Sequence, residues 1–559
     1  MIPEPSSPPR DTSSPRGRSR TRVAARSSLL AAAAVVVFYA ALYALAPTDR
    51  PVIIADSPGY LAVGRWLTGA GEIPQQLSPF YSWFYGAVFA VPYSITPDLD
   101  VAYAFGVALN CVTGGVLFVL LDRIVRRAFP DLAPRLATVL AISGACWAGV
   151  SIQVGQIWPE IVLAAMVAGW TLAILRLGAG AARAPLELSL ITVVMFATHH
   201  RMAGAILVAG ALLASHARRT GLRQVVAPFL VLAGGLALTL LVDRVVKDAL
   251  YPRGAADVPF RLALDAPDLV LQVLIGELWA TAAATGGLIA LARSFPRERS
   301  MVLPALGAAF VLTALLGAAQ LGAALEAGAA FRGDFFAYGR YVSPFVPVLV
   351  VLGAARLVTS RRWSVAGVAP AAVIIASALQ LTVNGTTLGG FTVPLQVSGL
   401  LGMGIFGVPL DLVRPSLLAC GFAVALAVLT DRVRPGMLAG TIAAVTLLVA
   451  AGGAERISNY LGRADDGGDH IVSFLDTLPS DVPVYVDPST GSGTFELLQM
   501  MRPARRFRAQ AADARSPMAY VVHGQLWSPP PRAEVTTVSD VGAFQVLSCV
   551  GDQCPRPTR

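Results

Sequence analysis

The chain has 559 residues, of which 55% are hydrophobic and 14% are charged, and its mean hydropathy is +0.64. A soluble protein of this size carries about a quarter charged residues, so this composition excludes an ordinary soluble domain. The net charge of +9 does not indicate nucleic-acid binding, because most arginines lie in short segments between apolar blocks. The sequence therefore predicts an integral membrane protein with no nucleic-acid partner.

Composition divides the chain into three parts. Residues 1–26 are rich in Pro, Ser and Arg, which predicts a disordered, basic cytoplasmic tail. Residues 27–453 contain apolar blocks of roughly 20 residues, the length that crosses a hydrocarbon core. These blocks predict about thirteen transmembrane helices, at 28–46, 101–121, 134–154, 161–175, 186–198, 202–215, 225–241, 269–292, 301–325, 342–355, 365–383, 412–429 and 437–451.

Arginines follow every second block, which predicts a cytoplasmic N-terminus and an extracytoplasmic C-terminus. Loop 47–100, between the first two blocks, is then extracytoplasmic. A polar loop is expected at 243–268, and the Gly-rich segment 384–411 is expected to be re-entrant or to lie at the membrane surface. The class predicted for residues 27–453 is an all-α polytopic membrane domain.

Residues 454–559 alternate short apolar runs with polar turns, unlike the blocks before them. Runs that are apolar and β-branched predict strands, and longer amphipathic runs predict helices. We expect a small extracytoplasmic α/β domain, with strands at 482–487, 518–523 and 542–549 and helices at 468–478 and 494–501.

The five cysteines do not have the spacing of a zinc site. Cys111, Cys146 and Cys420 fall in apolar blocks and are expected to be packing residues. Cys549 and Cys554 lie in the polar tail, where an extracytoplasmic location permits a disulfide. No Walker loop, GxSxG, HExxH or dinucleotide fingerprint is present, so a nucleotide-driven mechanism has no support.

Loop 47–100 contains an acidic residue, Asp56, at the start of a short amphipathic pattern that includes Tyr60. Asp56 could act as a general base toward a hydroxyl. It could equally be a helix N-cap, because Ser57 and Pro58 follow it. An aromatic run at 80–85 is typical of the interface between lipid and water.

Further ionisable groups are predicted on the same side of the membrane as Asp56, where such groups are usually paired or functional. Glu160 opens a predicted span, and an acidic first-turn residue there also suits the helix dipole. His199, His200 and Arg201 form a polar turn that could be structural or could hold a phosphate. Arg340, beside Tyr341, could extend to the interface or bind a lipid phosphate. The remaining candidates are Glu72 and Asp334.

The order of these parts resembles the C-type superfamily of membrane glycosyltransferases, over about residues 28–360. Asp56 and Tyr60 are similar to the acidic residue and tyrosine that members carry after the first span. SPFYSWFYGAVF (78–89) is similar to their Pro- and Tyr-rich stretch, and Glu160 resembles a later acidic residue. GRYVSPFVPVL (339–349) looks like their Gly-Arg-Tyr-x-x-Pro segment.

The resemblance implies a polyprenyl-phosphate sugar donor whose phosphate lies near Arg340 or His200 and Arg201. Asp56 would deprotonate a hydroxyl of a cell-envelope acceptor, which would attack the anomeric carbon and invert it. Ser57 stands where many members have a second acidic residue, so a divalent metal remains an open alternative. A transporter or flippase of a lipid-linked glycan, and a non-catalytic envelope scaffold, are the competing hypotheses.

Overall fold

The computed structural model describes residues 15–45, 57–70, 82–250, 261–291, 301–326, 333–360, 368–383, 397–401, 403, 412–477, 484–486, 507–508, 519–524, 536–541 and 544–549. Its α-helices are α1 (Pro15–Ala44), α2 (Ser57–Thr68), α3 (Trp83–Val88), α4 (Ala90–Tyr93), α5 (Leu99–Ala128), α6 (Pro134–Ala145), α7 (Ala148–Ser151), α8 (Glu160–Gly178), α9 (Ala184–Thr198), α10 (Ala203–Thr220), α11 (Val226–Leu250), α12 (Arg261–Asp265), α13 (Pro267–Ala284), α14 (Leu288–Leu291), α15 (Val302–Glu326), α16 (Val346–Ser360), α17 (Val368–Val383), α18 (Ser398–Leu401), α19 (Val413–Arg432) and α20 (Pro435–Thr477). The 3₁₀ helices are η1 (His200–Met202), η2 (Leu222–Gln224), η5 (Gly333–Ala337) and η6 (Ser343–Phe345).

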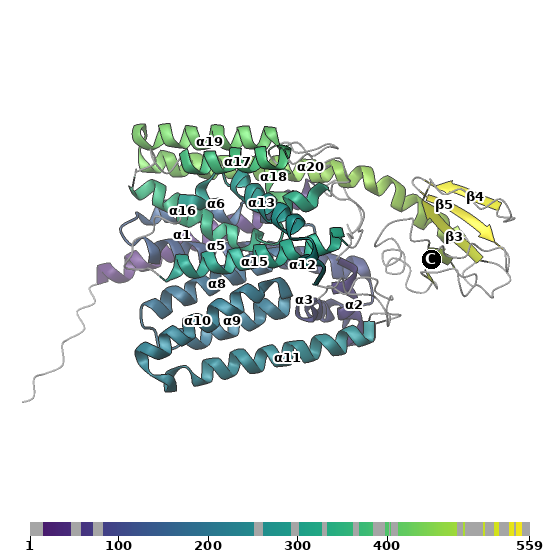
Figure 1. The fold of residues 1–559 in the computed structure, drawn as a ribbon, viewed down its shortest axis with the longest axis horizontal. Helices are drawn as coiled ribbons and strands as arrows, with labels where there is room; N and C mark the ends of the chain where they lie inside the picture. Colours follow the sequence, from purple (N-terminus) through teal and green to yellow (C-terminus); the bar gives the residue numbers. More distant parts are fainter. Residues whose placement is uncertain are drawn as a thin grey trace, which may run out of the picture.

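The long helices lie side by side in one bundle, and the short helices α2 and α3 cover one end of it (Figure 1). Within the described residues, eight helices are long and apolar enough to cross a membrane. Two shorter apolar helices, Ala184–Thr198 and Val368–Thr382, accompany them. The chain is thus a multi-pass membrane protein, and the predicted total of thirteen spans remains a prediction.

The outer faces of the bundle are apolar, as a lipid environment requires. On α11, Leu230, Leu238 and Leu241 are each more than half exposed, whereas Asp243 on the same helix is buried. This distribution is the reverse of a soluble helix, whose polar face points outward. It matches a helix that has lipid on one side and the bundle on the other.

Two predicted spans are broken in the structure. The span at 134–154 ends at Ala145, and a short helix and a series of turns carry the chain to Glu160. The span at 269–292 is interrupted after α13, where Gly286 and Gly287 both have positive φ. Only glycine adopts that conformation without steric cost, so the helix cannot continue through the pair. Hydropathy predicts a span from the length of an apolar block, but it does not predict a turn within that block.

Three other boundaries differ from the predictions. Helix α1 begins at Pro15, inside the tail expected to be disordered, because Arg and Ala favour helix and Pro suits a first turn. Helix α11 continues to Leu250, so Asp243 is helical and not in the predicted polar loop. Helix α20 is 43 residues long and runs through the predicted domain boundary at 453/454. It also includes residues 468–477 of the helix predicted at 468–478.

Beyond the end of α20 lies a five-stranded sheet with the order β2-β1-β3-β5-β4 (Figure 1). Strand β1 is parallel to β2 and β3, and β5 is antiparallel to β3 and β4. Strands β1 and β5 lie within segments predicted to be strands, β3 extends one residue past the predicted segment 518–523, and β2 and β4 were not predicted. The bounds are β1 (Val484–Val486), β2 (Phe507–Arg508), β3 (Ala519–Gly524), β4 (Thr536–Val541) and β5 (Phe544–Cys549).

Several predictions for the later part of the chain fall outside the described residues. They are the helix at 494–501, most of the segment 384–411, and Cys554, with which Cys549 was expected to pair. The assignment of 454–559 to an extracytoplasmic α/β domain remains a prediction.

Candidate functional site

The backbone turn before α8, which positions Glu160, is held by side-chain hydrogen bonds. The side-chain amide of Asn110 on α5 donates hydrogen bonds to the carbonyls of Val154 (3.0 Å) and Gln156 (2.8 Å). The Tyr103 hydroxyl donates to the carbonyl of Gly155 over 2.7 Å. These bonds satisfy carbonyls that no helix pairs, and they fix the route by which the chain enters α8.

The carboxylate of Glu160 is fully buried and lies between two arginines. Its Oε1 accepts a hydrogen bond from Arg340 Nε at 2.6 Å and another from an Arg201 terminal nitrogen at 3.0 Å. All three side chains are at most 3% exposed. Residues 160, 201 and 340, far apart in sequence, thus form one cluster, which we call the Glu160 triad. The sequence predicted each residue separately but gave no sign that they meet.

The triad has one excess positive charge, because two guanidinium groups face one carboxylate. Such a charge is costly in a buried site unless an anion balances it. Donor capacity also remains, since Arg201 Nε has no hydrogen-bond partner among the described residues. Guanidinium groups bind phosphate oxygens through charge-assisted hydrogen bonds. The triad therefore has the charge and the donors to bind an anion.

Aromatic rings hold both guanidinium groups in place. Arg340 lies over the ring of Trp158, 3.8 Å from its centroid, and Arg201 lies 5.9 Å from the centroid of Tyr341. Cation–π contacts of this kind are strongest where water is excluded. Tyr341 itself packs closely on α15, because a Cβ added at Gly317 would meet its ring at 2.5 Å.

The turn that carries Arg340 is closed by its own hydrogen bonds. The hydroxyl of Ser343 donates to the Arg340 carbonyl over 2.9 Å, and the Ser343 amide donates to the Gly339 carbonyl over 3.0 Å. Gly339 and Tyr341 thus lie on a fixed turn just before η6. Asp334, earlier in this segment, has a side chain outside the described part of the structure.

The structure separates the two histidines that follow α9. His199 Nδ1 accepts a hydrogen bond from the backbone amide of Arg201 (3.3 Å). Burial, and then the charges of Arg201 and Arg340, lower the pKa of His199 well below its usual range. His199 is therefore neutral at pH 7 and lies near the triad.

His200 faces another part of the bundle. Its Nε2 lies 3.6 Å from the carboxylate of Asp243 on α11, and its ring stacks on Phe196 with centroids 4.8 Å apart. Lys247 pairs with the same carboxylate over 3.3 Å. Adjacent residues of a 3₁₀ turn point in different directions, so His200 and Arg201 face different partners. Their joint binding of a phosphate remains a prediction.

The first loop reaches the triad through aromatic side chains. Tyr60 on α2 is buried and meets Tyr85 on α3 edge to face, with centroids 5.0 Å apart. Burial, and to a smaller extent the nearby Glu160 carboxylate, raises the pKa of Tyr85. Tyr85 thus links this loop to the triad. Asp56 precedes the first residue of α2, but Asp56 and Glu72 lie outside the described residues.

Two residues near the triad were not among the predicted site residues. Tyr85 belongs to an aromatic run that the sequence analysis assigned to the membrane interface. Glu277 is fully buried on α13, in a block that was counted only as a span. An acidic residue within an apolar block was the signal available for Glu277, since such residues are rare and usually functional.

A divalent metal does not fit the donor set at Glu160. Its carboxylate is bound to two cations, whereas such metals require several anionic or neutral oxygens. Among the described residues, no three His, Cys, Asp or Glu side chains gather closely enough to hold a metal ion. Binding of a divalent metal at Asp56 remains a hypothesis.

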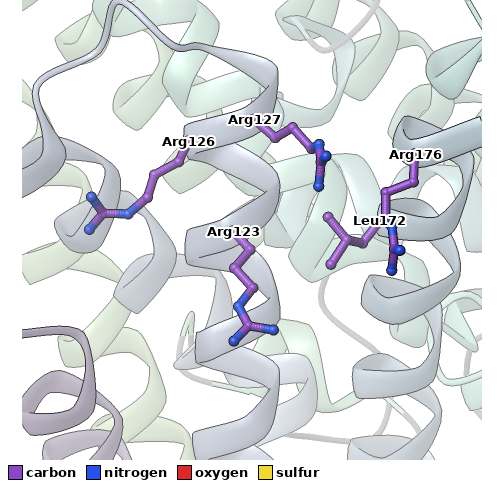
Figure 2. A pocket seen from close by; sticks show the side chains of 5 residues that line it. All are labelled: Arg123, Arg126, Arg127, Leu172 and Arg176. Carbon is purple, nitrogen blue, oxygen red and sulfur yellow. The ribbon is translucent and has the colours of Figure 1, made fainter. Parts of the chain in front are cut away.

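A second group of arginines lies at the opposite end of α8. A hollow of about 470 Å³ is lined by Arg123, Arg126 and Arg127 of α5 and by Leu172 and Arg176 of α8 (Figure 2). Here Arg126 pairs with Asp122 at 2.8 Å, and Arg176 pairs with Glu187 at 2.8 Å. About 24 Å separates residues 160 and 176 along α8, at 1.5 Å per residue. This hollow is therefore separate from the triad.

No protein-family model matches the chain, and no curated protein matches it in sequence. Its fold is similar to the crystal structure of ArnT from Cupriavidus metallidurans bound to undecaprenyl phosphate. That match has a TM-score of 0.51 and 16% identity, and it covers 94% of this chain and 99% of that one. The apo structure of ArnT gives a TM-score of 0.50 with the same identity and coverage.

The arabinosyltransferase EmbB from Mycobacterium smegmatis also matches, at 13% identity and a TM-score of 0.39, over 92% of this chain and 45% of that one. That score is too low to support an argument. The likeness to ArnT shows that the two chains share a fold.

Proposed function

We propose that this protein transfers a sugar from a polyprenyl-phosphate donor to a hydroxyl of a cell-envelope acceptor at the extracytoplasmic face of the membrane. The observation that supports this most strongly is the Glu160 triad, a buried anion-binding group at the end of a membrane-spanning helix. A related fold with undecaprenyl phosphate bound, that of ArnT, supports the class of donor.

In this proposal Arg201 and Arg340 bind the phosphate of the donor. A sugar phosphodiester carries one negative charge, and the polyprenyl phosphate that leaves carries up to two. Guanidinium groups already oriented by Glu160 stabilise the charge that develops as the bond to the anomeric carbon breaks. Glu160 is then a positioning residue, because it touches the arginines and not the reacting atoms.

Asp56 is proposed as the general base. The acceptor hydroxyl gives its proton to the Asp56 carboxylate as its oxygen forms a bond to the anomeric carbon. The electrons of the broken bond leave with the phosphate, so the displacement is direct and the anomeric centre inverts. Position 56 precedes α2, whose residue Tyr60 contacts Tyr85 beside the triad.

The test is transfer of radiolabelled sugar from polyprenyl phosphate in membranes of strains that carry single variants. Asp56→Asn is expected to abolish transfer at unchanged protein level. Asp100→Asn, an exposed carboxylate of the same loop, is the matched control and should leave transfer unchanged. Full transfer by Asp56→Asn would remove that residue from the mechanism.

A deletion strain identifies the substrates and separates the competing functions. Accumulated donor together with a truncated envelope glycan is the result expected for a transferase. Counterflow of a lipid-linked sugar by the purified protein, without any new glycosidic product, would instead favour a flippase. Loss of a partner complex without a glycan defect would favour a scaffold.

A further inference from the structure

Glu277 is a second buried carboxylate in the membrane domain, and the mechanism above does not use it. Its side chain is fully buried on α13. Neither carboxylate oxygen has a hydrogen-bond partner among the described residues. A buried carboxylate without donors costs several kcal/mol relative to a solvated one. Natural structures keep such a group where something else completes its hydrogen bonds.

The backbone beside Glu277 is in unusually close contact with the segment that leads to Arg340. A Cβ added at Gly276 would lie 1.6 Å from the carbonyl oxygen of Phe336 in η5, so only glycine fits there. The same stretch of α13 packs Val273 into a cluster that includes Phe336 and Tyr341. The contact fixes Glu277 relative to the turn that holds Arg340 and Tyr341.

Glu277 also lies within electrostatic reach of the triad. Its carboxyl group is close enough to Arg201 and to the Tyr341 hydroxyl for each to influence the ionisation of the other. It forms no ion pair with Arg201, whose terminal nitrogen bonds Glu160 instead. The site therefore has a cationic part, made by the two arginines, and a separate acidic part, made by Glu277.

A narrow crevice begins one turn along α13 from Glu277. Ala280 and Thr281 line it from α13, and Ala337 and Gly339 line it from the Arg340 turn. Trp147, Ala284, Val397, Gly399 and Leu400 complete its lining. Most of these side chains are small, and the large one is aromatic. The crevice has a volume of about 10 Å³, no more than one water molecule needs, so a sugar ring enters only if these side chains move apart. The aromatic ring would then suit the apolar face of the sugar.

We propose that Glu277 is the sugar-binding subsite of this centre and accepts hydrogen bonds from hydroxyls of the donor sugar. This inference rests on the proposed function. A carboxyl group offers oxygen acceptors to hydroxyl donors, so Glu277 suits the sugar and the arginines suit the phosphate. The two parts together match a sugar joined to a phosphate, and only the acidic part distinguishes the donor from the spent lipid.

The test measures two affinities with the purified full-length protein in lipid nanodiscs. One ligand is undecaprenyl phosphate, and the others are undecaprenyl phosphate carrying mannose, arabinose or aminoarabinose. The wild-type protein is expected to bind at least one sugar-bearing lipid more tightly than the bare lipid. Glu277→Gln should reduce that preference by about tenfold to a hundredfold, the range for a hydrogen bond to a charged group. Its affinity for the bare lipid should stay within about twofold.

The controls separate this inference from a structural role and from the proposed function. Glu187→Gln on α9, where the side chain pairs with Arg176 at the far end of α8, should change neither affinity. Glu277→Asp keeps the carboxyl group on a side chain that is shorter by one methylene, so its oxygens lie farther from the sugar. This variant is measured if Glu277→Gln does not accumulate.

A preference that survives both Glu277 variants, equal weakening of both ligands, or no preference in the wild type would overturn the sugar subsite. In each of those results the wild-type protein would still bind undecaprenyl phosphate, so the proposed function would not be refuted. Failure of the wild-type protein to bind any polyprenyl phosphate would instead refute the proposed function.

Discussion

At one end of α8, Glu160 is buried between Arg201 and Arg340. At the other end, Arg176 pairs with Glu187 and belongs to a hollow lined by four arginines. Both ends pair carboxylates with guanidinium groups over similar distances, from 2.6 to 3.0 Å. Their exposure differs, since Arg176 and Glu187 are about a third exposed and the triad is at most 3% exposed.

The two ends of α8 have similar ion pairs, and it is burial that distinguishes the Glu160 triad from the exposed pair. Exposed pairs contribute little, because water screens them and their side chains lose conformational freedom. Buried charges interact strongly and are costly if left alone. Arginines such as Arg123 and Arg127 are what the positive-inside rule expects in a cytoplasmic region, and they require no ligand.

The largest expected effect is the loss of the carboxylate at the buried end. Glu160→Ala leaves two guanidinium groups buried together and should lower the free energy of unfolding by about 3–5 kcal/mol. Glu187→Ala, the matched change at the exposed end, should cost about 1 kcal/mol or less. Thermal unfolding of both variants in detergent measures the difference. Equal destabilisation would contradict the contrast between the two ends.

The next effect concerns the shape of the cation. Arg340→Lys keeps the charge but loses the fork of donors and the flat face that lies over Trp158. Sugar transfer should fall by about tenfold or more, as expected for one lost hydrogen bond to a charged group. Arg176→Lys serves as the control and should retain transfer within about twofold. If lysine supports full transfer at position 340, only the charge matters.

Packing behind the triad should have a smaller effect. Gly317→Ala on α15 places a methyl group 2.5 Å from the ring of Tyr341. Such overpacking costs about 1–3 kcal/mol and should displace the ring that contacts Arg201. Gly307→Ala on the same helix has open space and should be neutral or slightly stabilising. Unfolding temperatures and transfer rates of the two variants provide the comparison.

The smallest effect is a dependence on pH. The pKa of His199 is lowered in the folded protein, whereas in the unfolded chain it is about 6.5. As pH falls below about 6.5, the unfolded chain binds a proton that the folded protein does not, so stability decreases. His199→Gln should reduce this loss, which is at most about 1.4 kcal/mol per pH unit. Unfolding measured from pH 7.5 to 5.5 should show a shallower slope, and an unchanged slope would mean that His199 is not buried in its neutral form.

The sequence alone predicted the class of the protein, because spans are long apolar blocks that can be read locally. It also predicted strands β1, β3 and β5 and named every member of the triad. It did not predict the breaks at Ala145 and at Gly286, because hydropathy averages over the turn of a chain that remains apolar. The continuation of α11 past Asp243 was also not predicted. In that case the charged residues were interpreted as the end of the span, although the helix continues through them.

Three features depended on the tertiary structure. They are the pairing of Glu160 with Arg201 and Arg340, the orientation of His200 away from Arg201, and the position of Glu277. Each results from how helices distant in sequence pack together, and an ion pair leaves no local pattern at its two ends. The residue types were fixed by the sequence, and their burial was fixed by the fold. Because burial determines the strength of a charge, it was the fold that turned a set of separate ionisable residues into one strongly interacting buried cluster.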